Sequence, residues 1–275
     1  MLQKVAVPAV SVGVRTMGDW LDLSVDLGDL KEEDLYRILE AYRQKKTYYR
    51  LKSGEFLKLE DNGLMTVARI AQAAEETGGR HRDRQLRLPR YRAMYLDALY
   101  REYGGIRFDR DAMYRSLVRG MKSAEDGEFE IPASLMPVLR GYQRTGFRWL
   151  KTLDACGFGG ILADDMGLGK TVQAIAVLYD TAMKEPGQTS LIVCPASLVY
   201  NWECEIRRFA PSLKVLTAVG TAGEREEKLR YLKEYDVAIT SYDLLKRDLE
   251  QYRETVFRFQ ILDEAQYIKN PLTQA

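Results

Sequence analysis

A glycine-containing turn between an apolar segment and a helical segment constrains the fold of this chain most strongly. The sequence GILADDMGLGKT runs from Gly160 to Thr171, and it predicts a buried strand over 160–163, a turn, and a helix that begins with Lys and Thr. Such a turn directs backbone N–H groups and a helix N-terminus toward a phosphate chain. Lys170 is expected to reach the β- and γ-phosphates of a nucleotide, and the Thr171 hydroxyl to bind Mg²⁺. The segment therefore predicts a nucleoside triphosphate site.

The match to the phosphate-loop pattern GxxxxGK[S/T] is incomplete. The chain has Asp164 where the pattern has its first glycine. Taken alone, the segment is also consistent with an ordinary connection from a strand to a helix. A second motif is needed to decide between these interpretations.

That second motif is an acidic pair near the C-terminal end of the chain. The sequence Ile261-Leu262-Asp263-Glu264 predicts an apolar strand that delivers two carboxylates to the C-terminal edge of a sheet, where α/β proteins bind ligands. Asp263 is suited to hold Mg²⁺, directly or through water, and Glu264 to orient and deprotonate an attacking water. A solvated Asp-Glu pair at a strand end is the alternative. Together with the Lys170 turn, the pair predicts phosphoryl-transfer chemistry with Lys170, Asp263 and Glu264 as the catalytic residues.

The pattern of predicted elements divides the chain at about residue 130. After that point, strands alternate with helices, which predicts an α/β fold with a parallel sheet. The expected strands are 160–163, 190–195, 214–219, 236–242 and 257–264, and the expected helices are 139–155, 171–183, one carrying Trp202, 224–233 and 244–252. The polar segment 123–130 is the expected boundary between domains 1–130 and 131–275.

The opening region predicts a smaller α+β domain without a chemical constellation of its own. Its expected elements are strands at 5–14 and 21–27, a hairpin of 47–51 with 55–59, a helix that includes Leu35 and Ile38, and a helix at 63–76. Arginine is frequent from 80 to 92, which we interpret as a solvated linker, with a phosphate-binding face as the alternative.

Composition excludes several classes of protein. With 41 basic and 40 acidic residues the net charge is +1, so any polyanion site must be a local patch. Three cysteines without metal-ligand spacing indicate a reducing, cytoplasmic location and no zinc site. No apolar run approaches the ~20 residues that span a bilayer, so no membrane partner is expected. His81 is the only histidine, which excludes chemistry built on several histidines.

The motifs, taken in order, resemble those of Swi/Snf-type ATPases, which are DNA translocases of helicase superfamily two. The string 163–171, with MGLGKT at its centre, is similar to that family's nucleotide loop, which also has an acidic residue at the position of Asp164. DEAQ at 263–266, followed by KNP at 269–271, resembles the family's acidic motif. LRGYQ at 139–143 resembles its adenine motif.

Two further segments, CPASL at 194–198 with Asn201 and TSY at 240–242, resemble motifs that contact the backbone of DNA. The resemblance implies that Ser197, Asn201, Thr240 and Ser241 contact DNA. For Ser197 and Asn201, a helix cap and a polar helix face are the alternatives.

The resemblance implies an incomplete RecA-like lobe (lobe one of a P-loop NTPase) at 131–275 and a helicase-associated domain, as in bacterial members, at 1–130. The implied cofactors are ATP and Mg²⁺, with Thr171 and Asp263 holding the metal and Gln143 reading the base. The implied nucleotide-binding residues are Gln143, Asp165, Met166, Gly167, Leu168, Gly169, Lys170 and Thr171. The implied partners are double-stranded DNA and DNA-bound protein complexes.

The implied function is an ATP-dependent DNA translocase or remodelling motor. The family's motor has two lobes and this chain ends within the first, so we expect it to bind nucleotide and to hydrolyse it poorly by itself. One alternative is an RNA helicase of the DEAD-box type, against which Gln266 and the MGLG sequence at 166–169 both argue. The other is a non-catalytic nucleotide-binding interaction module.

Overall fold

The computed structural model of the chain forms two compact units, residues 1–123 and 124–275. The structure describes residues 5–6, 10–26, 28, 37–38, 40–42, 44, 46–51, 54–59, 62–78, 85–122 and 129–268. None of the helices described here is long and apolar enough to span a membrane.

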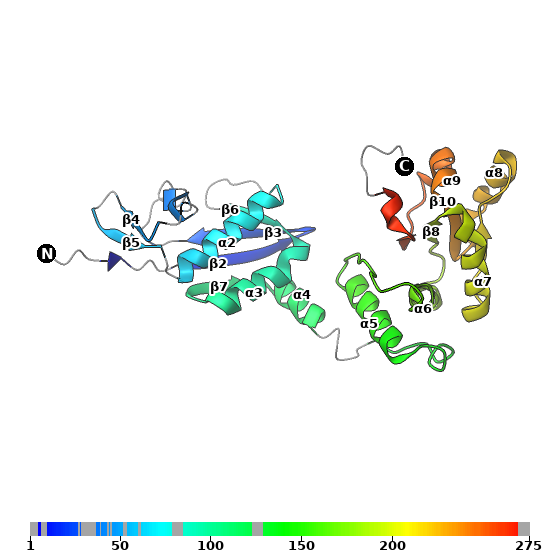
Figure 1. Cartoon of the computed structure of the whole chain (residues 1–275), viewed down its shortest axis with the longest axis horizontal. Coiled ribbons are helices and arrows are strands. Elements are labelled where there is room, and N and C mark those ends of the chain that lie inside the picture. Colours follow the sequence, from blue (N-terminus) through cyan, green and yellow to red (C-terminus); the bar gives the residue numbers. More distant parts are fainter. Residues whose placement is uncertain are drawn as a thin grey trace. The chain divides into compact units, whose positions relative to one another are not determined.

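A four-stranded sheet with helices on one face forms the first unit (Figure 1). The strand order is β6 (Gln85–Pro89), β3 (Trp20–Asp26), β2 (Val10–Met17) and β7 (Ile106–Arg110), with β2 and β7 parallel and the other pairs antiparallel. Along β2, buried residues alternate with more exposed ones, so that one face of the sheet is apolar. This face packs against α2 (Asn62–Glu76), α3 (Ala93–Tyr103) and α4 (Ala112–Lys122).

A small second sheet joins β1 (Val5–Ala6), β5 (Phe56–Lys58) and β4 (Tyr48–Arg50). The predicted hairpin is confirmed, because β4 and β5 pair antiparallel. The single strand predicted over 5–14 is wrong, because β1 and β2 belong to different sheets. The helix predicted around Leu35 lies partly outside the described residues, although Ile38 is helical and buried.

The predicted linker at 80–92 is also wrong where the structure describes it. Residues 85–89 form β6, and the buried Leu86 and Leu88 flank the exposed Arg87, which bonds to Asp22 on the neighbouring strand. The alternation of apolar and charged residues is the pattern of a half-buried strand. Residues 79–84 lie outside the described residues.

The second unit contains a parallel sheet of four strands with helices on both faces, as the sequence predicts. The strand order is β11 (Gln260–Leu262), β8 (Ser190–Cys194), β10 (Val237–Ser241) and β9 (Val215–Thr217). Alternate residues of the strands enter two cores. The helices are α5 (Gly141–Ala155), α6 (Lys170–Lys184), α7 (Val199–Phe209), α8 (Ala222–Arg230), α9 (Tyr242–Arg247) and α10 (Leu249–Tyr252), labelled in part in Figure 1.

Two predicted elements of this unit differ from the structure. Residues 160–163 do not form a strand: none of the described strands pairs with them, and the side chain of Ile161 is 86% exposed. The helix predicted over 244–252 is interrupted at Asp248. The carboxylate of Asp248 accepts two hydrogen bonds from the buried Arg225 of α8, at 2.6 and 2.7 Å, which fixes this break.

Candidate nucleotide-binding site

The turn before α6 requires glycine at two positions. Gly167 and Gly169 have φ angles of +84° and +74°, in the left-handed region that side chains disfavour. Gly169 is the N-cap of α6, so its conformation sets the direction in which the helix begins. The sequence MGLGKT therefore specifies a tight turn directly into a helix N-terminus.

The side chain of Lys170 curls back over this turn. Its ammonium Nζ donates to the backbone carbonyl oxygens of Asp164 and Asp165, at 2.7 and 3.1 Å. The N-cap residue Gly169 has no side chain to cap α6, so it leaves the first backbone N–H groups of the helix without a cap bond. Lys170 and the adjacent Thr171 are both partly exposed. A cation and free backbone donors therefore meet at one exposed loop.

Gln143 joins α5 to the same loop. Its Oε1 accepts from the backbone N of Arg140, at 2.9 Å, and its Nε2 donates to the carbonyl oxygen of Leu168, also at 2.9 Å. Tyr142 donates to the same carbonyl through its hydroxyl. A Cβ on Gly169 would lie 2.5 Å from Nε2 of Gln143. The Gln143 amide therefore packs directly against the glycine turn.

The acidic pair begins where β11 ends. The backbone N of Asp263 donates to Val193 of β8, which ties the residue to the sheet. Its carboxylate accepts from Nε1 of Trp202, at 2.8 Å, and from the backbone N of Glu264, at 3.0 Å. Glu264 has a φ of +51°, a strained conformation for a residue with a side chain, and it accepts a hydrogen bond from Gln266. The chain therefore turns sharply between the two carboxylates.

The connections of the sheet place the glycine turn and the acidic pair at the same edge. Residues 185–189 alone connect the end of α6 to the start of β8, so the end of α6 lies at the N-terminal edge of β8. Ile175 and Leu178 of α6 pack in one core with Ile192 of β8, so the helix runs back along the strand. Its N-terminus therefore lies toward the C-terminal edge, where Asp263 follows the parallel strand β11.

The residues predicted to contact DNA differ in their exposure. Ser197 and Asn201 are exposed, and Asn201 donates to Glu205 on the next turn of α7. Thr240 and Ser241 are 0% and 2% exposed, and Ser241 caps α9 by accepting from Leu244. The side chains of Thr240 and Ser241 thus present no surface to a DNA backbone in this structure, because the end of β10 lies inside the unit.

The contacts of three residues in this region are not predicted from the sequence. Trp202 of α7 positions the Asp263 carboxylate through the hydrogen bond from its Nε1. Tyr242 donates to the carbonyl of Asp263, at 2.7 Å, and stacks on Tyr267. Gln173 is buried, and its Nε2 contacts Asp164 Oδ2 and the carbonyl of Gly169, both at 3.4 Å. A polar residue four positions after the turn is the sequence signal for Gln173, whereas the contacts to Asp263 join distant segments.

Comparison with known proteins places each unit in a described family. Residues 142–275 match the family described as SNF2-related domain, and residues 2–132 match the family described as bacterial SNF2 helicase associated. Helicase SWR1 of Eremothecium gossypii is 44% identical over 144 residues, covering 51% of this chain and 10% of that protein. The Bacillus subtilis protein YwqA, named as an ATP-dependent helicase/translocase, is 40% identical over 177 residues, covering 62% of this chain and 19% of that protein.

Among solved structures, the Sulfolobus solfataricus SWI2/SNF2 ATPase core in complex with dsDNA is 42% identical. The match covers 49% of this chain and 28% of that one, with a TM-score of 0.45, too low to transfer structural detail. The matches to Helicase SWR1 and to YwqA each cover less than a fifth of the length of that protein. With a helicase-associated domain followed by an SNF2-related domain, the chain belongs to the SNF2 family of helicase-like ATPases.

Proposed function

We propose that residues 131–275 form the ATP-binding part of a motor that couples ATP hydrolysis to movement on duplex DNA, and that residues 1–130 form its helicase-associated domain. One observation carries this proposal. The packing of α6 along β8 directs the glycine turn with Lys170 toward the C-terminal edge of the parallel sheet, where β11 ends at Asp263 and where α/β proteins bind ligands. Membership of the SNF2 family and the helicase/translocase name of YwqA support the same function.

Each site residue has a proposed role in this function. Lys170 binds the β- and γ-phosphates, while the backbone from Asp165 to Gly169 encloses the phosphate chain. Thr171 and Asp263 hold Mg²⁺, which neutralises charge on the phosphates when it is bound. Glu264 orients the attacking water and accepts its proton.

The residues present fit a magnesium nucleotide. Among the described residues there is no cluster of three or more His, Cys, Asp or Glu side chains that could hold a metal. A Mg²⁺ ion held by one or two protein oxygens together with substrate phosphates needs no such cluster. Each carboxylate oxygen of Asp263 accepts one hydrogen bond and has a further lone pair for a metal or its water.

Gln143 is proposed to read the adenine base. Its amide makes one donated and one accepted hydrogen bond, which leaves one N–H and one lone pair for a ligand. Because the same amide contacts Leu168, base recognition and the shape of the glycine turn are coupled through this one side chain.

Duplex DNA is the proposed partner of the motor, with Ser197 and Asn201 as exposed backbone contacts, and DNA-bound protein complexes are the proposed objects of remodelling. The comparisons give no support to an RNA helicase of the DEAD-box type. The unpaired state of Cys156, Cys194 and Cys204 supports a reducing cytoplasm. We also propose that these 275 residues bind ATP but hydrolyse it poorly by themselves.

Binding of a fluorescent ATP analogue to Lys170→Ala tests this function against a non-catalytic scaffold. We expect the variant to bind at least about tenfold more weakly, because a charge-assisted hydrogen bond to phosphate contributes about 1.5–3 kcal/mol. Lys246→Ala, which removes an exposed lysine from α9, is the matched control and should bind as tightly as the unchanged chain. Equal binding by all three proteins, or binding by none, would favour the scaffold.

A further inference from the structure

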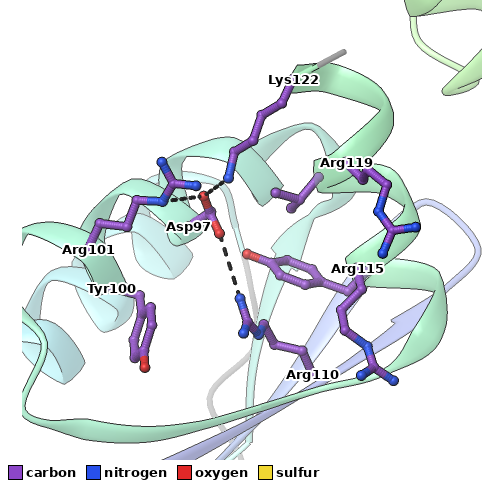
Figure 2. A pocket seen from close by; sticks show the side chains of 9 residues that line it. Asp97, Tyr100, Arg101, Arg110, Arg115, Arg119 and Lys122 are labelled. Atoms are coloured by element: carbon purple, nitrogen blue, oxygen red, sulfur yellow. Dashed lines mark hydrogen bonds and ion pairs between the residues drawn. The ribbon is translucent and has the colours of Figure 1, made fainter.

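A cavity in the unit formed by residues 1–123 is rich in positive charge. Its volume is about 360 Å³, and its walls come from α3, the end of β7 and α4 (Figure 2). The charged residues that line it are Asp97, Arg101, Arg110, Arg115, Arg119 and Lys122. Five cations thus surround one carboxylate. We call this surface the cationic groove.

The single carboxylate is already shared by three of the cations. Asp97 is buried, and its oxygens lie 2.6 Å from Lys122 Nζ, 3.2 Å from Arg101 Nε and 3.8 Å from Arg110 Nη1. Figure 2 shows these three side chains converging on it. One negative charge balances only one of the three, so this cluster alone retains an excess of positive charge.

Arg115 and Arg119 add two more charges and have no carboxylate partner among the described residues. Arg115 contacts only the backbone carbonyl of Asp111, at 3.3 Å, and both guanidinium groups belong to exposed residues on consecutive turns of α4. Figure 2 shows them extending along the same side of the helix, away from Asp97. Both also line a second, adjoining cavity of about 240 Å³. The acidic segment that follows α4 in the sequence lies outside the described residues.

We infer that the cationic groove binds the phosphate backbone of duplex DNA, as a contact separate from the nucleotide-binding unit. Guanidinium groups match phosphate in shape and charge. At a rise of 1.5 Å per residue, Arg115 and Lys122 lie about 10 Å apart along α4, which equals the axial rise of about three steps of one DNA strand at about 3.4 Å each. The net charge of the whole chain is only +1, so a polyanion must be attracted by a local patch such as this one.

The choice of duplex DNA over other nucleic acids rests on the proposed function, whereas the recognition of phosphate rests on the groove alone. An acidic segment of a partner protein is the competing occupant. Phosphate is favoured because Arg115 and Arg119 present two exposed guanidinium groups on consecutive turns of one helix, where they can bind successive phosphates, and because backbone contacts need no matching sequence.

Fluorescence anisotropy of a labelled 20-base-pair duplex of arbitrary sequence tests the inference. The whole 275-residue chain is titrated without nucleotide at several salt concentrations, as the unchanged protein and as Arg115→Ala/Arg119→Ala. Alanine is the best helix former, and both sites are exposed, so the variant should fold normally. The control, Arg15→Ala/Arg107→Ala, removes the same charge from exposed positions on the opposite face of the sheet.

We expect the groove variant to bind at least about tenfold more weakly at 0.1 M salt. The plot of log binding constant against log salt concentration should become less steep by about 1.8, because each DNA phosphate that the protein no longer neutralises reduces the steepness by about 0.9. The control should change neither quantity. Equal binding by the two variants would overturn the inference, as would a groove variant that loses affinity for labelled polyglutamate but keeps its affinity for the duplex. Because no nucleotide is present, loss of the ATP site by Lys170→Ala would not alter this result.

Discussion

Replacing Gly169 with alanine tests how the glycine turn, α6 and Gln143 depend on one another. At a φ of +74°, a residue with a side chain costs about 1–2 kcal/mol. The added Cβ would also lie 2.5 Å from Gln143 Nε2, so the amide must move and weaken its bond to Leu168, at a cost of about 1 kcal/mol. We therefore expect Gly169→Ala to lower the free energy of unfolding by about 2–3 kcal/mol.

Gly167→Ala is the matched control. Gly167 has a similar φ of +84°, but a Cβ there would meet no atom within 4 Å. Only the backbone cost remains, so Gly167→Ala should lose about 1–2 kcal/mol. The difference of about 1 kcal/mol between the two variants reports the contacts of the added Cβ, which are the 2.5 Å approach to Gln143 and a looser 3.3 Å approach to Val172.

Urea unfolding followed by tryptophan fluorescence measures both losses. Trp20 belongs to the first unit, so a Trp20→Phe background makes the signal report only Trp149 and Trp202 of the second. In a Gln143→Ala background the amide is absent and only the 3.3 Å contact with Val172 remains, so most of the difference between Gly169→Ala and Gly167→Ala should disappear. A difference that persists in full without Gln143, or no difference in its presence, would refute the proposed coupling.

Three further predictions follow from single contacts. Arg225→Ala leaves the Asp248 carboxylate without its ion-pair partner, so it should lower the urea midpoint of unfolding, and an unchanged midpoint would contradict a stabilising role for this pair. Burial raises the pKa of the Cys194 thiol to about 12, so at pH 8 a thiol reagent should modify the exposed Cys204 and leave Cys194 unmodified until the unit unfolds. The protonated thiol of Cys194 favours the folded state, and this contribution to the free energy of unfolding is present in full below about pH 9 and declines as the pH rises toward the folded pKa. The hydrogen bond from Arg258 lowers the pKa of Glu185. The ionised Glu185 therefore stabilises the folded state above pH 4.5, and this contribution is lost as the pH falls through the lowered pKa. The stability of Arg258→Gln should depend less on pH in this acid range, and an acid unfolding transition unchanged from that of the original chain would contradict the contribution of Glu185.

Much of the second unit could be predicted from the sequence because its signals are local. Apolar runs alternate with amphipathic helices, and the strands β8 and β10 lie close to their predicted ranges. The strand predicted over 160–163 failed because a strand exists only when a neighbour pairs with it, which an apolar run cannot reveal. The break at Asp248 depends on Arg225, a partner distant in sequence, and could not be predicted for the same reason.

The candidate site likewise combines features that follow from the local sequence with contacts between residues that are distant in the sequence. The turn conformations of Gly167 and Gly169 follow from residue type and spacing. The bond from Trp202 to Asp263 joins residues far apart in the sequence and becomes visible only in three dimensions. At 80–92 the abundance of arginine led to the wrong prediction, although the alternation of Leu86 and Leu88 with charged residues indicated a strand.

The effect of Mg²⁺ on nucleotide binding by Asp263→Asn tests the central claim most directly. If Lys170 and Asp263 act on one magnesium nucleotide, Mg²⁺ should tighten binding of a fluorescent ATP analogue to the unchanged chain. It should have much less effect on Asp263→Asn, while binding without metal stays similar in both. Equal enhancement by Mg²⁺ in the two proteins would show that Asp263 lies outside the nucleotide site and would contradict the account.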